Sequence, residues 1–232
     1  MRKVCVVAGV GPGNGVSLSR QFAADGYTVV MLARNIESLA KWSAAIPDSI
    51  ALACDLSDPS AVETTFGHIL DHIGPVETLV YNAGSGVWTS VMDTAIDDLQ
   101  RAWATNVLGL LVSAQQVIPS MLEKQSGNIM VIGATASLRG GAQSTAFASA
   151  KAAQRSLAQS MARDLGPKGI HVGYVIIDGI IDLERTRARL PDKPDAFFMQ
   201  ADAIAKSVVS LTQQDRSAWT FELDLRPFGE RW

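Results

Sequence analysis

Short apolar runs rich in β-branched residues alternate along the chain with longer segments in which apolar residues recur every three or four positions. The runs read KVCVVAG, YTVVMLA, SIALAC, ETLVYNAG, NIMVIGA, IHVGYVII and SAWTFELDL. Such runs indicate strands, and the periodic segments indicate helices, for example over residues 59–73. Regular alternation of the two predicts a parallel sheet with helices on both faces, which right-handed crossovers make doubly wound. We therefore expect an α/β fold with about seven mostly parallel strands.

The longest predicted helix covers about residues 97–121. Its apolar residues fall at steps of three and four and form one broad stripe: Val107, Leu110, Leu111, Ala114, Val117, Ile118 and Met121. The one irregular region, about residues 183–198, contains ERTRARLPDKPD. Because ligands of such sheets lie beyond the carboxyl ends of the strands, this region is a candidate substrate lid. A chain of 232 residues without repeats or linkers is expected to form a single domain over residues 1–232.

Composition and charge narrow the classes of partner. Hydrophobic residues make up 47% of the chain, the formal net charge is −3, and Lys and Arg are scattered, so no basic surface for nucleic acid is expected. The first apolar run is too short for a signal peptide, and none approaches the roughly 18 apolar residues of a membrane span. We expect a cytoplasmic protein without a membrane partner. Cys5 and Cys54 are expected to be small buried hydrophobes. His68 and His72 have metal-ligand spacing, but no third ligand accompanies them and no metal is expected.

A glycine-rich loop, GVGPGNG, follows the first predicted strand and precedes a helix. Its glycines, Gly9, Gly13 and Gly15, have the spacing G-x-x-x-G-x-G, with Asn14 between the last two. Glycines there allow a tight turn and a close approach of the backbone to a pyrophosphate, which rests on the N-terminus of the helix. The loop therefore predicts a dinucleotide site.

Arg34 follows the second predicted strand, where a NAD-binding protein would carry an acidic residue for the ribose 2′-hydroxyl. A guanidinium suits a 2′-phosphate instead, so we expect NADP(H) to be preferred over NAD(H). The alternative is that Arg34 is a solvated residue near the start of a helix.

Taken in order, the glycine loop, Asn82-Ala83-Gly84, Asn106 and Lys151 resemble the motifs of the short-chain dehydrogenase/reductase family. The resemblance covers roughly residues 3–180. It implies a Rossmann-like fold, a nicotinamide cofactor, a small-molecule substrate, and a homodimer or homotetramer.

The resemblance also implies roles for individual residues. Asp55 matches the aspartate that touches the adenine ring, and Asn82-Ala83-Gly84 match the stretch beside it, with Tyr81 in place of that motif's first Asn. Asn106 matches the asparagine that holds a water in a proton relay. Lys151 matches the lysine that binds the nicotinamide ribose, although an ordinary surface lysine is the alternative.

Two departures from the family pattern concern the chemistry. The family's catalytic Tyr falls on Phe147 and its catalytic Ser falls on Ala134, and neither side chain can donate a proton. Asp178-Gly179 stand where the family has Pro-Gly, with one extra residue; they are expected beside the cofactor.

Several groups remain as proton donors in place of the tyrosine. A water held between Lys151 and Asn106 is the most natural one, and Asp178 is another if burial raises its pKa. Hydroxyls near the two substituted positions are weaker acids: Thr135, Ser137, Ser144 and Thr145. The first three are expected to serve turns and a helix cap.

The candidate lid carries Arg185, Arg187 and Arg189. They suit an anionic substrate such as an acyl-CoA, or form an ordinary solvated face. The sequence as a whole predicts an NADP(H)-dependent oxidoreductase that acts on a carbonyl, an alcohol or an enoyl group with a non-standard proton donor. The alternatives are a catalytically impaired NADP(H)-binding sensor or partner-binding protein, and chemistry on this fold without hydride transfer.

Overall fold

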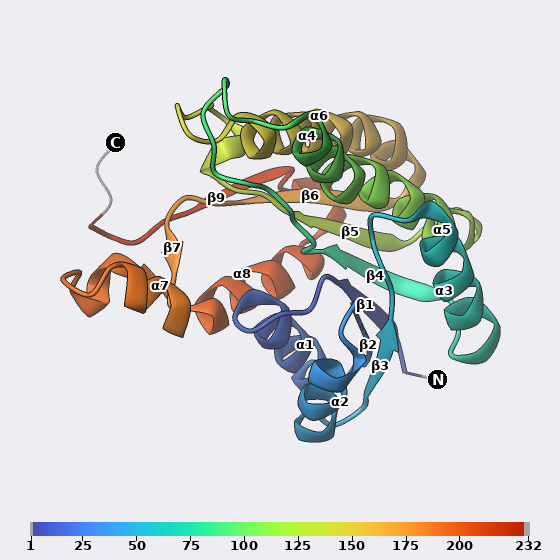
Figure 1. Ribbon diagram of the computed structural model, residues 1–232. Coiled ribbons are helices and arrows are strands. Elements are labelled where there is room, and N and C mark those ends of the chain that lie inside the picture. Colours follow the sequence, from blue (N-terminus) through green and yellow to red (C-terminus); the bar gives the residue numbers. More distant parts are fainter. Residues whose placement is uncertain (1, 230–232) are drawn as a thin grey trace.

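A computed structural model describes residues 2–229 (Figure 1). Its centre is a seven-stranded sheet in the order β3-β2-β1-β4-β5-β6-β9. Every neighbouring pair of these strands is parallel, which confirms the predicted α/β class. The strands are β1 (Val4–Ala8), β2 (Thr28–Ala33), β3 (Ser49–Ala53), β4 (Val76–Tyr81), β5 (Gly127–Ile132), β6 (Ile170–Ile177) and β9 (Glu222–Leu225). The run SAWTFELDL is strand only over its last part.

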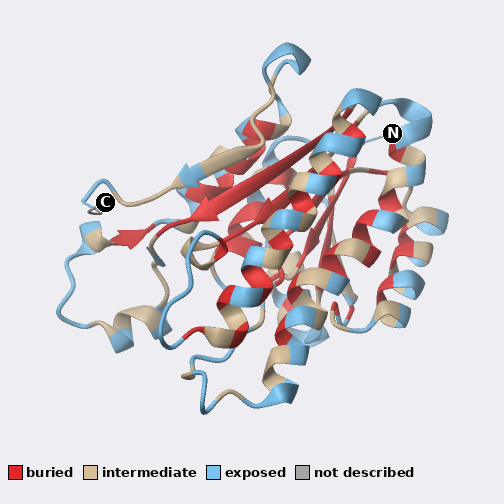
Figure 2. Cartoon of the chain, turned by 90° about the horizontal axis from the view of Figure 1, so that it is seen from above, coloured by how far each residue is buried: buried red, intermediate tan, exposed pale blue. Residues whose placement is uncertain are grey.

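Helices cover both faces of the sheet. One layer contains α1 (Asn14–Ala24), α2 (Ile36–Ala45) and α8 (Ala201–Thr212), and lies below the sheet in Figure 1. The other contains α3 (Pro59–His72), α4 (Ile96–Trp103), α5 (Gly109–Lys124) and α6 (Thr145–Leu165), and lies above and to the right of the sheet. Figure 2 shows buried strands between partly exposed helices.

The alternation of side chains along β1 explains the two layers. Val4 and Val6 pack into the core cluster that contains Phe66 of α3, and Cys5 and Val7 pack into the cluster that contains Phe22 of α1. Successive side chains of a strand point to opposite faces. An uninterrupted apolar run thus forms a strand that is buried on both faces.

The long helix predicted over residues 97–121 is present but interrupted. A π-helical turn, Ala104–Leu108, separates α4 from α5. The predicted apolar stripe faces the core, with Leu110, Ala114, Val117 and Met121 buried beside α3 and the sheet. The helix lies where the sequence predicted it, and the π turn within it was not predicted.

The candidate lid has more regular structure than predicted. It contains the short helix α7 (Glu184–Arg189) and a 3₁₀ turn at Asp195–Phe197. A two-stranded parallel sheet of β7 (Ile180–Ile181) and β8 (Phe198–Met199) closes its base. Figure 1 shows this unit beyond one end of the main sheet.

The two cysteines are buried, as predicted. Cys5 and Cys54 are free thiols whose pKa values are raised by burial.

The two histidines at metal-ligand spacing contact each other. The rings of His68 and His72 stack with centroids 4.4 Å apart. Within residues 2–229, no group of three or more His, Cys, Asp or Glu side chains is placed to hold a metal. In the same part of the chain, no helix has the length and apolar character needed to cross a bilayer.

Candidate active site

A pocket of about 650 Å³ opens beyond the carboxyl ends of the strands. It lies where β1 and β4 are neighbours, which is the point at which the strand order changes direction and where open α/β sheets bind ligands. Of the predicted site residues, these line it: Gly9, Asn14, Gly15, Arg34, Asp55, Asn82, Ala83, Gly84, Ala134, Phe147, Lys151 and Gly179. Gly13, Asn106 and Asp178 lie next to lining segments without lining the pocket themselves.

The glycine loop forms one end of the pocket from backbone atoms. Gly9 has φ +96°, and a Cβ on it would lie 2.5 Å from Ala83 Cα. The side-chain amide of Asn82 donates a hydrogen bond of 2.6 Å to the Gly9 carbonyl, which fixes the loop against β4. A Cβ on Gly15 would lie 2.6 Å from Val10 Cα. Only glycine fits at these two positions, and the N-terminus of α1 is left open to an anion.

Arg34 and Asp55 lie farther along the same end, after β2 and β3. The Asp55 carboxylate accepts hydrogen bonds from Ser57 Oγ at 2.7 Å and from the Ser57 backbone N–H at 3.0 Å. These bonds lower the pKa of Asp55, and the nearby Arg34 charge lowers it further. The exposed Arg34 guanidinium places a positive charge beside Asp55.

The π turn places Asn106 at the opposite end. Its side-chain amide donates hydrogen bonds of 2.7 Å to the carbonyls of Ser85 and Ala102. A π turn disturbs the regular helical bonding pattern, and two of its carbonyls are satisfied by side chains from elsewhere. Tyr81 donates to the Thr105 carbonyl at 2.5 Å, and Gln154 donates to the Asn106 carbonyl at 2.7 Å.

Lys151 lies on α6 with its amine buried inside this network. Nζ donates hydrogen bonds of 2.9 Å to the Ile132 carbonyl and to Gln154 Oε1. Burial lowers the pKa of Lys151 to about 7, because a charge is costly away from water. Gln154 was not predicted as part of the site. The signal that could have found it is its position three residues after Lys151, on the same face of the helix.

Lys151 and Asn106 face the same small space beside Gly84. A Cβ on Gly84 would lie 3.5 Å from Asn106 Oδ1 and 3.6 Å from Lys151 Nζ. Asn106 Oδ1 is buried and has no hydrogen-bond partner among the described residues. A proton donor and an unused acceptor therefore meet at the edge of the pocket, an arrangement that suits a bridging water.

Phe147 and Ala134 also line this end, and neither carries a side-chain polar atom. The Phe147 ring lies against Gly86, where a Cβ would be 2.5 Å from Phe147 Cδ2. Its centroid is 5.2 Å from that of Trp88. That Phe147 and Ala134 occupy the places of the family's tyrosine and serine stays a prediction.

The hydroxyl of Tyr174, on β6, joins the hydrogen-bond network around Lys151 and Gln154. The hydroxyl is 2.7 Å from Ser137 Oγ and 3.4 Å from Gln154 Oε1. Burial raises its pKa to about 12, and the residue does not belong to the pocket lining. Tyr174 therefore supports the Lys151 network from behind and is poorly placed to meet a substrate.

The other predicted donors are engaged in local contacts, and none of them belongs to the pocket lining within the described chain. Thr135 donates to Asp178 Oδ1 at 2.5 Å, and Asp178 Oδ2 lies 3.5 Å from an Arg226 nitrogen. Ser137 accepts from the backbone N–H of Ala134. Ser144 bonds Gly141 in the turn before α6, and Thr145 donates to the Thr89 carbonyl. Turn and bridging roles thus account for these side chains.

Comparison with known proteins places this geometry in context. A family model described as short chain dehydrogenase matches residues 3–193. A 3-oxoacyl-[acyl-carrier-protein] reductase of Rattus norvegicus is 30% identical over 220 residues, which cover 92% of this chain and 92% of that protein.

Two solved structures share the fold over almost the whole chain. A short-chain dehydrogenase from Rhodopseudomonas palustris has a TM-score of 0.84 at 34% identity, covering 97% of this chain and 99% of its own. A metagenomic short-chain oxidoreductase in complex with NADP has a TM-score of 0.85 at 24% identity, covering 98% of each chain. The second likeness shows the fold alone.

Proposed function

The chain belongs to the short-chain dehydrogenase family, and from that premise we propose that it is an NADP(H)-dependent oxidoreductase with a non-standard proton donor. Its substrate is a carbonyl compound or the corresponding alcohol, or an activated enoyl group. The observation that carries the proposal is one pocket that contains the glycine cradle, Arg34 and Lys151 together. A relative that reduces a 3-oxoacyl group supports the carbonyl substrate.

The residues of the pocket fit a dinucleotide. The glycine loop and the N-terminus of α1 hold the pyrophosphate, Asp55 borders the adenine, and Arg34 holds the 2′-phosphate. Asn82-Ala83-Gly84 and Gly179 line the path between them, and Lys151 binds the nicotinamide ribose. When bound, NADPH supplies a hydride to the substrate carbon.

Lys151 and Asn106 supply the proton that this reduction also consumes. A water between Nζ and Asn106 Oδ1 gives a proton to the substrate oxygen, and the Lys151 ammonium returns one to the water. The amine then regains its proton from solvent, so charge and atoms balance. A positioned acid of this kind contributes roughly 10²- to 10⁴-fold to a rate, and a water-mediated one is expected near the lower limit.

Purified protein with NADPH and a panel of ketones, aldehydes and enoyl thioesters tests the proposal. We expect slow NADPH oxidation whose kcat/KM falls as pH rises through about 7, because the Lys151 ammonium loses its proton there. Lys151→Met is expected to abolish turnover. No oxidation above buffer, with NADPH binding demonstrated in the same sample, would contradict the enzymatic proposal.

A second candidate function is an NADP(H)-binding sensor or partner-binding protein. The absence of hydroxyls on Ala134 and Phe147, both in the pocket lining, favours it. NADPH binding that changes thermal stability without any turnover is the result that selects this candidate. Chemistry without hydride transfer has no observation of its own in the pocket.

Assembly and location remain predictions. A homodimer or homotetramer and a cytoplasmic location are expected from the family. Four residues of the predicted helix stripe, Leu110, Ala114, Val117 and Met121, are buried within the chain itself, so most of the stripe serves the core of one chain. Sedimentation of the purified chain measures the oligomeric state.

A further inference from the structure

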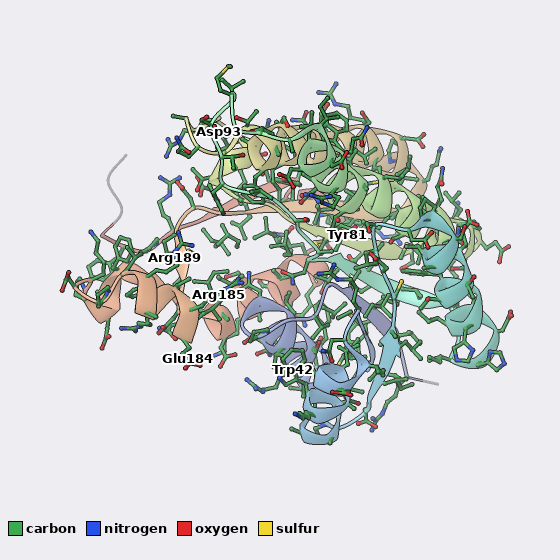
Figure 3. The ribbon with its side chains drawn as sticks, viewed as in Figure 1. Trp42, Tyr81, Asp93, Glu184, Arg185 and Arg189 are labelled. Atoms are coloured by element: carbon green, nitrogen blue, oxygen red, sulfur yellow. The ribbon has the colours of Figure 1, made fainter. Side chains whose placement is uncertain are left out.

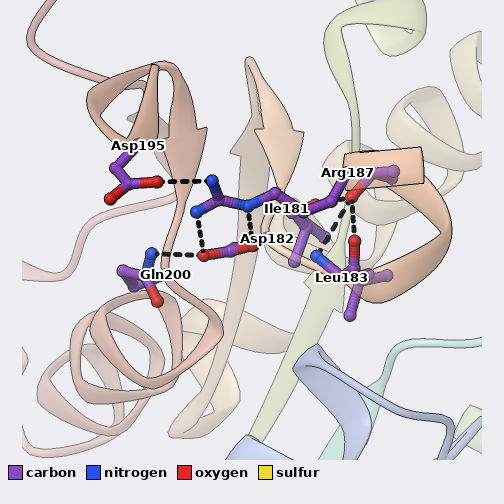
Figure 4. Close-up of polar contacts among 7 residues, drawn as sticks. Ile181, Asp182, Leu183, Arg187, Asp195 and Gln200 are labelled. Atoms are coloured by element: carbon purple, nitrogen blue, oxygen red, sulfur yellow. Dashed lines mark hydrogen bonds and ion pairs between the residues drawn. The ribbon is translucent and has the colours of Figure 1, made fainter. Parts of the chain in front are cut away.

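Arg187 fastens the lid to the rest of the fold. Its guanidinium donates two hydrogen bonds to Asp182, of 2.7 and 2.8 Å, and a third of 2.5 Å to Asp195 (Figure 4). It also stacks over the Phe198 ring, 4.3 Å from the centroid. Gln200 donates to the same Asp182 carboxylate. Bidentate pairing fixes geometry as well as adding energy, so Arg187 is committed to the lid and is not available to a ligand.

Thr186 fixes the first residues of the lid. Its hydroxyl donates to the Ile181 carbonyl at 2.7 Å and accepts from the Leu183 backbone N–H at 3.0 Å. Leu183 in turn lies against the glycine loop, where a Cβ on Gly13 would be 2.6 Å from Leu183 Cδ2. The start of α7 is therefore held beside the N-terminus of α1.

Arg185 stands apart from its two neighbours on α7. It lines the pocket together with Gly11 and Pro12 of the glycine loop. Figure 3 shows Arg185 above Glu184, on the side of α7 nearer the strands. Among residues 2–229 its side chain has neither a hydrogen bond nor an ion pair. An unpaired cation beside the open N-terminus of α1 makes this part of the pocket strongly attractive to an anion.

We propose that Arg185 binds the pyrophosphate of the dinucleotide, so that the lid recognises the cofactor and not an anionic substrate. This inference rests on the proposed function, because it takes NADP(H) as the occupant of the pocket. Arg185 follows Leu183 by two residues, a chain length of at most about 7 Å, and Leu183 touches Gly13. Arg34 lies after β2 and the reacting end is built by β5 and α6, so the pyrophosphate is the anion nearest to Arg185.

Titration of the full chain with NADPH and with NADH, followed by calorimetry, tests the inference. Arg185→Gln is expected to weaken both nucleotides to a similar extent, about tenfold, since both carry the pyrophosphate and one charged hydrogen-bonding group is lost. Arg189→Gln is the matched control, because Arg189 is on the same helix outside the pocket lining, and binding within twofold of the parent chain is expected. Circular dichroism confirms that both variants are folded.

Three results would overturn the inference. Unchanged affinity of Arg185→Gln for both nucleotides would remove the contact, and a loss confined to NADPH would assign Arg185 to the 2′-phosphate. A raised KM for substrate in Arg185→Gln, with unchanged nucleotide affinity, would show that Arg185 binds the substrate and not the cofactor. Each of these three results is compatible with the proposed function. A parent chain that binds neither nucleotide would contradict both the proposed function and this inference.

Discussion

The two ends of the pocket are built on opposite principles. The phosphate end is shaped by backbone atoms, because a Cβ on Gly9 or Gly15 would clash with the neighbouring backbone, and charged side chains lie around that backbone. The reacting end consists of buried side chains that hydrogen-bond one another, with Lys151, Gln154 and Asn106 at its centre. Pyrophosphate recognition is therefore expected to tolerate changes at the reacting end, whereas the chemistry depends on single polar atoms at that end.

Because of this contrast, cofactor binding and proton donation depend on largely different residues and can be tested separately. Phe147 and Ala134 leave the reacting end without its expected hydroxyls, yet the amine of Lys151 keeps two hydrogen bonds. No contact of the glycine loop depends on either residue. Substitutions at Phe147 or Ala134 are therefore expected to leave nucleotide affinity unchanged.

Gly9→Ala is expected to have the largest effect on stability and on nucleotide binding. The new Cβ would meet the Ala83 backbone, and φ +96° strains any residue with a side chain. We expect a loss of about 2–3 kcal/mol in the free energy of unfolding, measured by urea denaturation, and NADPH affinity below detection. Gly11→Ala is the control for stability, because a Cβ there would meet no atom within 4 Å. Equal losses in the two variants would contradict the backbone account of the phosphate end.

Lys151→Met tests the buried amine at the reacting end. Burial lowers the pKa of Lys151 from 10.5 to about 7, so between these values the unfolded chain binds a proton that the folded chain does not. The stability of the parent chain relative to Lys151→Met therefore rises with pH across this window, and the penalty of the buried amine is complete below pH 7. We expect the free energy of unfolding of the parent chain, relative to that of Lys151→Met, to rise by about 2 kcal/mol between pH 7 and pH 9.

Denaturation of both proteins across this pH range measures the difference. Lys124→Met, which removes an exposed lysine at the end of α5, serves as the control. A difference that stays flat with pH would show that Lys151 keeps its ordinary pKa in the folded chain, and the description of the reacting end as buried polar side chains would be contradicted.

Arg34→Gln has the smallest expected effect and tests whether Arg34 binds the 2′-phosphate. It should weaken NADPH about tenfold, equivalent to about 1.4 kcal/mol, and leave NADH within twofold, because only NADPH carries the 2′-phosphate. Nucleotide titrations with Arg163→Gln as a surface control measure this ratio. Equal weakening of the two nucleotides would contradict the assignment of Arg34 to the 2′-phosphate.

The strands and the phosphate end could be predicted from sequence because local signals specify them. Apolar runs indicated every strand of the main sheet, and the glycine loop between a strand and a helix indicated the pocket. The π turn could not be predicted, since ATNVL keeps a helical apolar period. Its carbonyls are satisfied by Tyr81 and Gln154, which approach from distant elements.

The spacing of the arginines in the lid indicates that they do not all face the same way. Arg185 and Arg187 are two residues apart, and in a helix such residues face nearly opposite directions. The sequence left two alternatives for the three arginines of α7, an anion site and a solvated face. Arg187 is not available to an anion, because it is bound to Asp182 and Asp195. The partners of Arg187 lie on both sides of α7 in sequence, so only the folded lid reveals them.

A comparison of the parent chain with the double variant Ala134→Ser, Phe147→Tyr tests whether a non-standard donor supplies the proton. Both are assayed for reduction of the same ketones at saturating NADPH, and the dissociation constant for NADPH is measured in each. We expect unchanged NADPH affinity and a rate up to roughly 10²-fold higher in the double variant, because the water relay of the parent chain already supplies the lower limit of what a positioned acid contributes. A parent chain as fast as the double variant, or a folded and NADPH-bound double variant that gains nothing, would contradict this expectation.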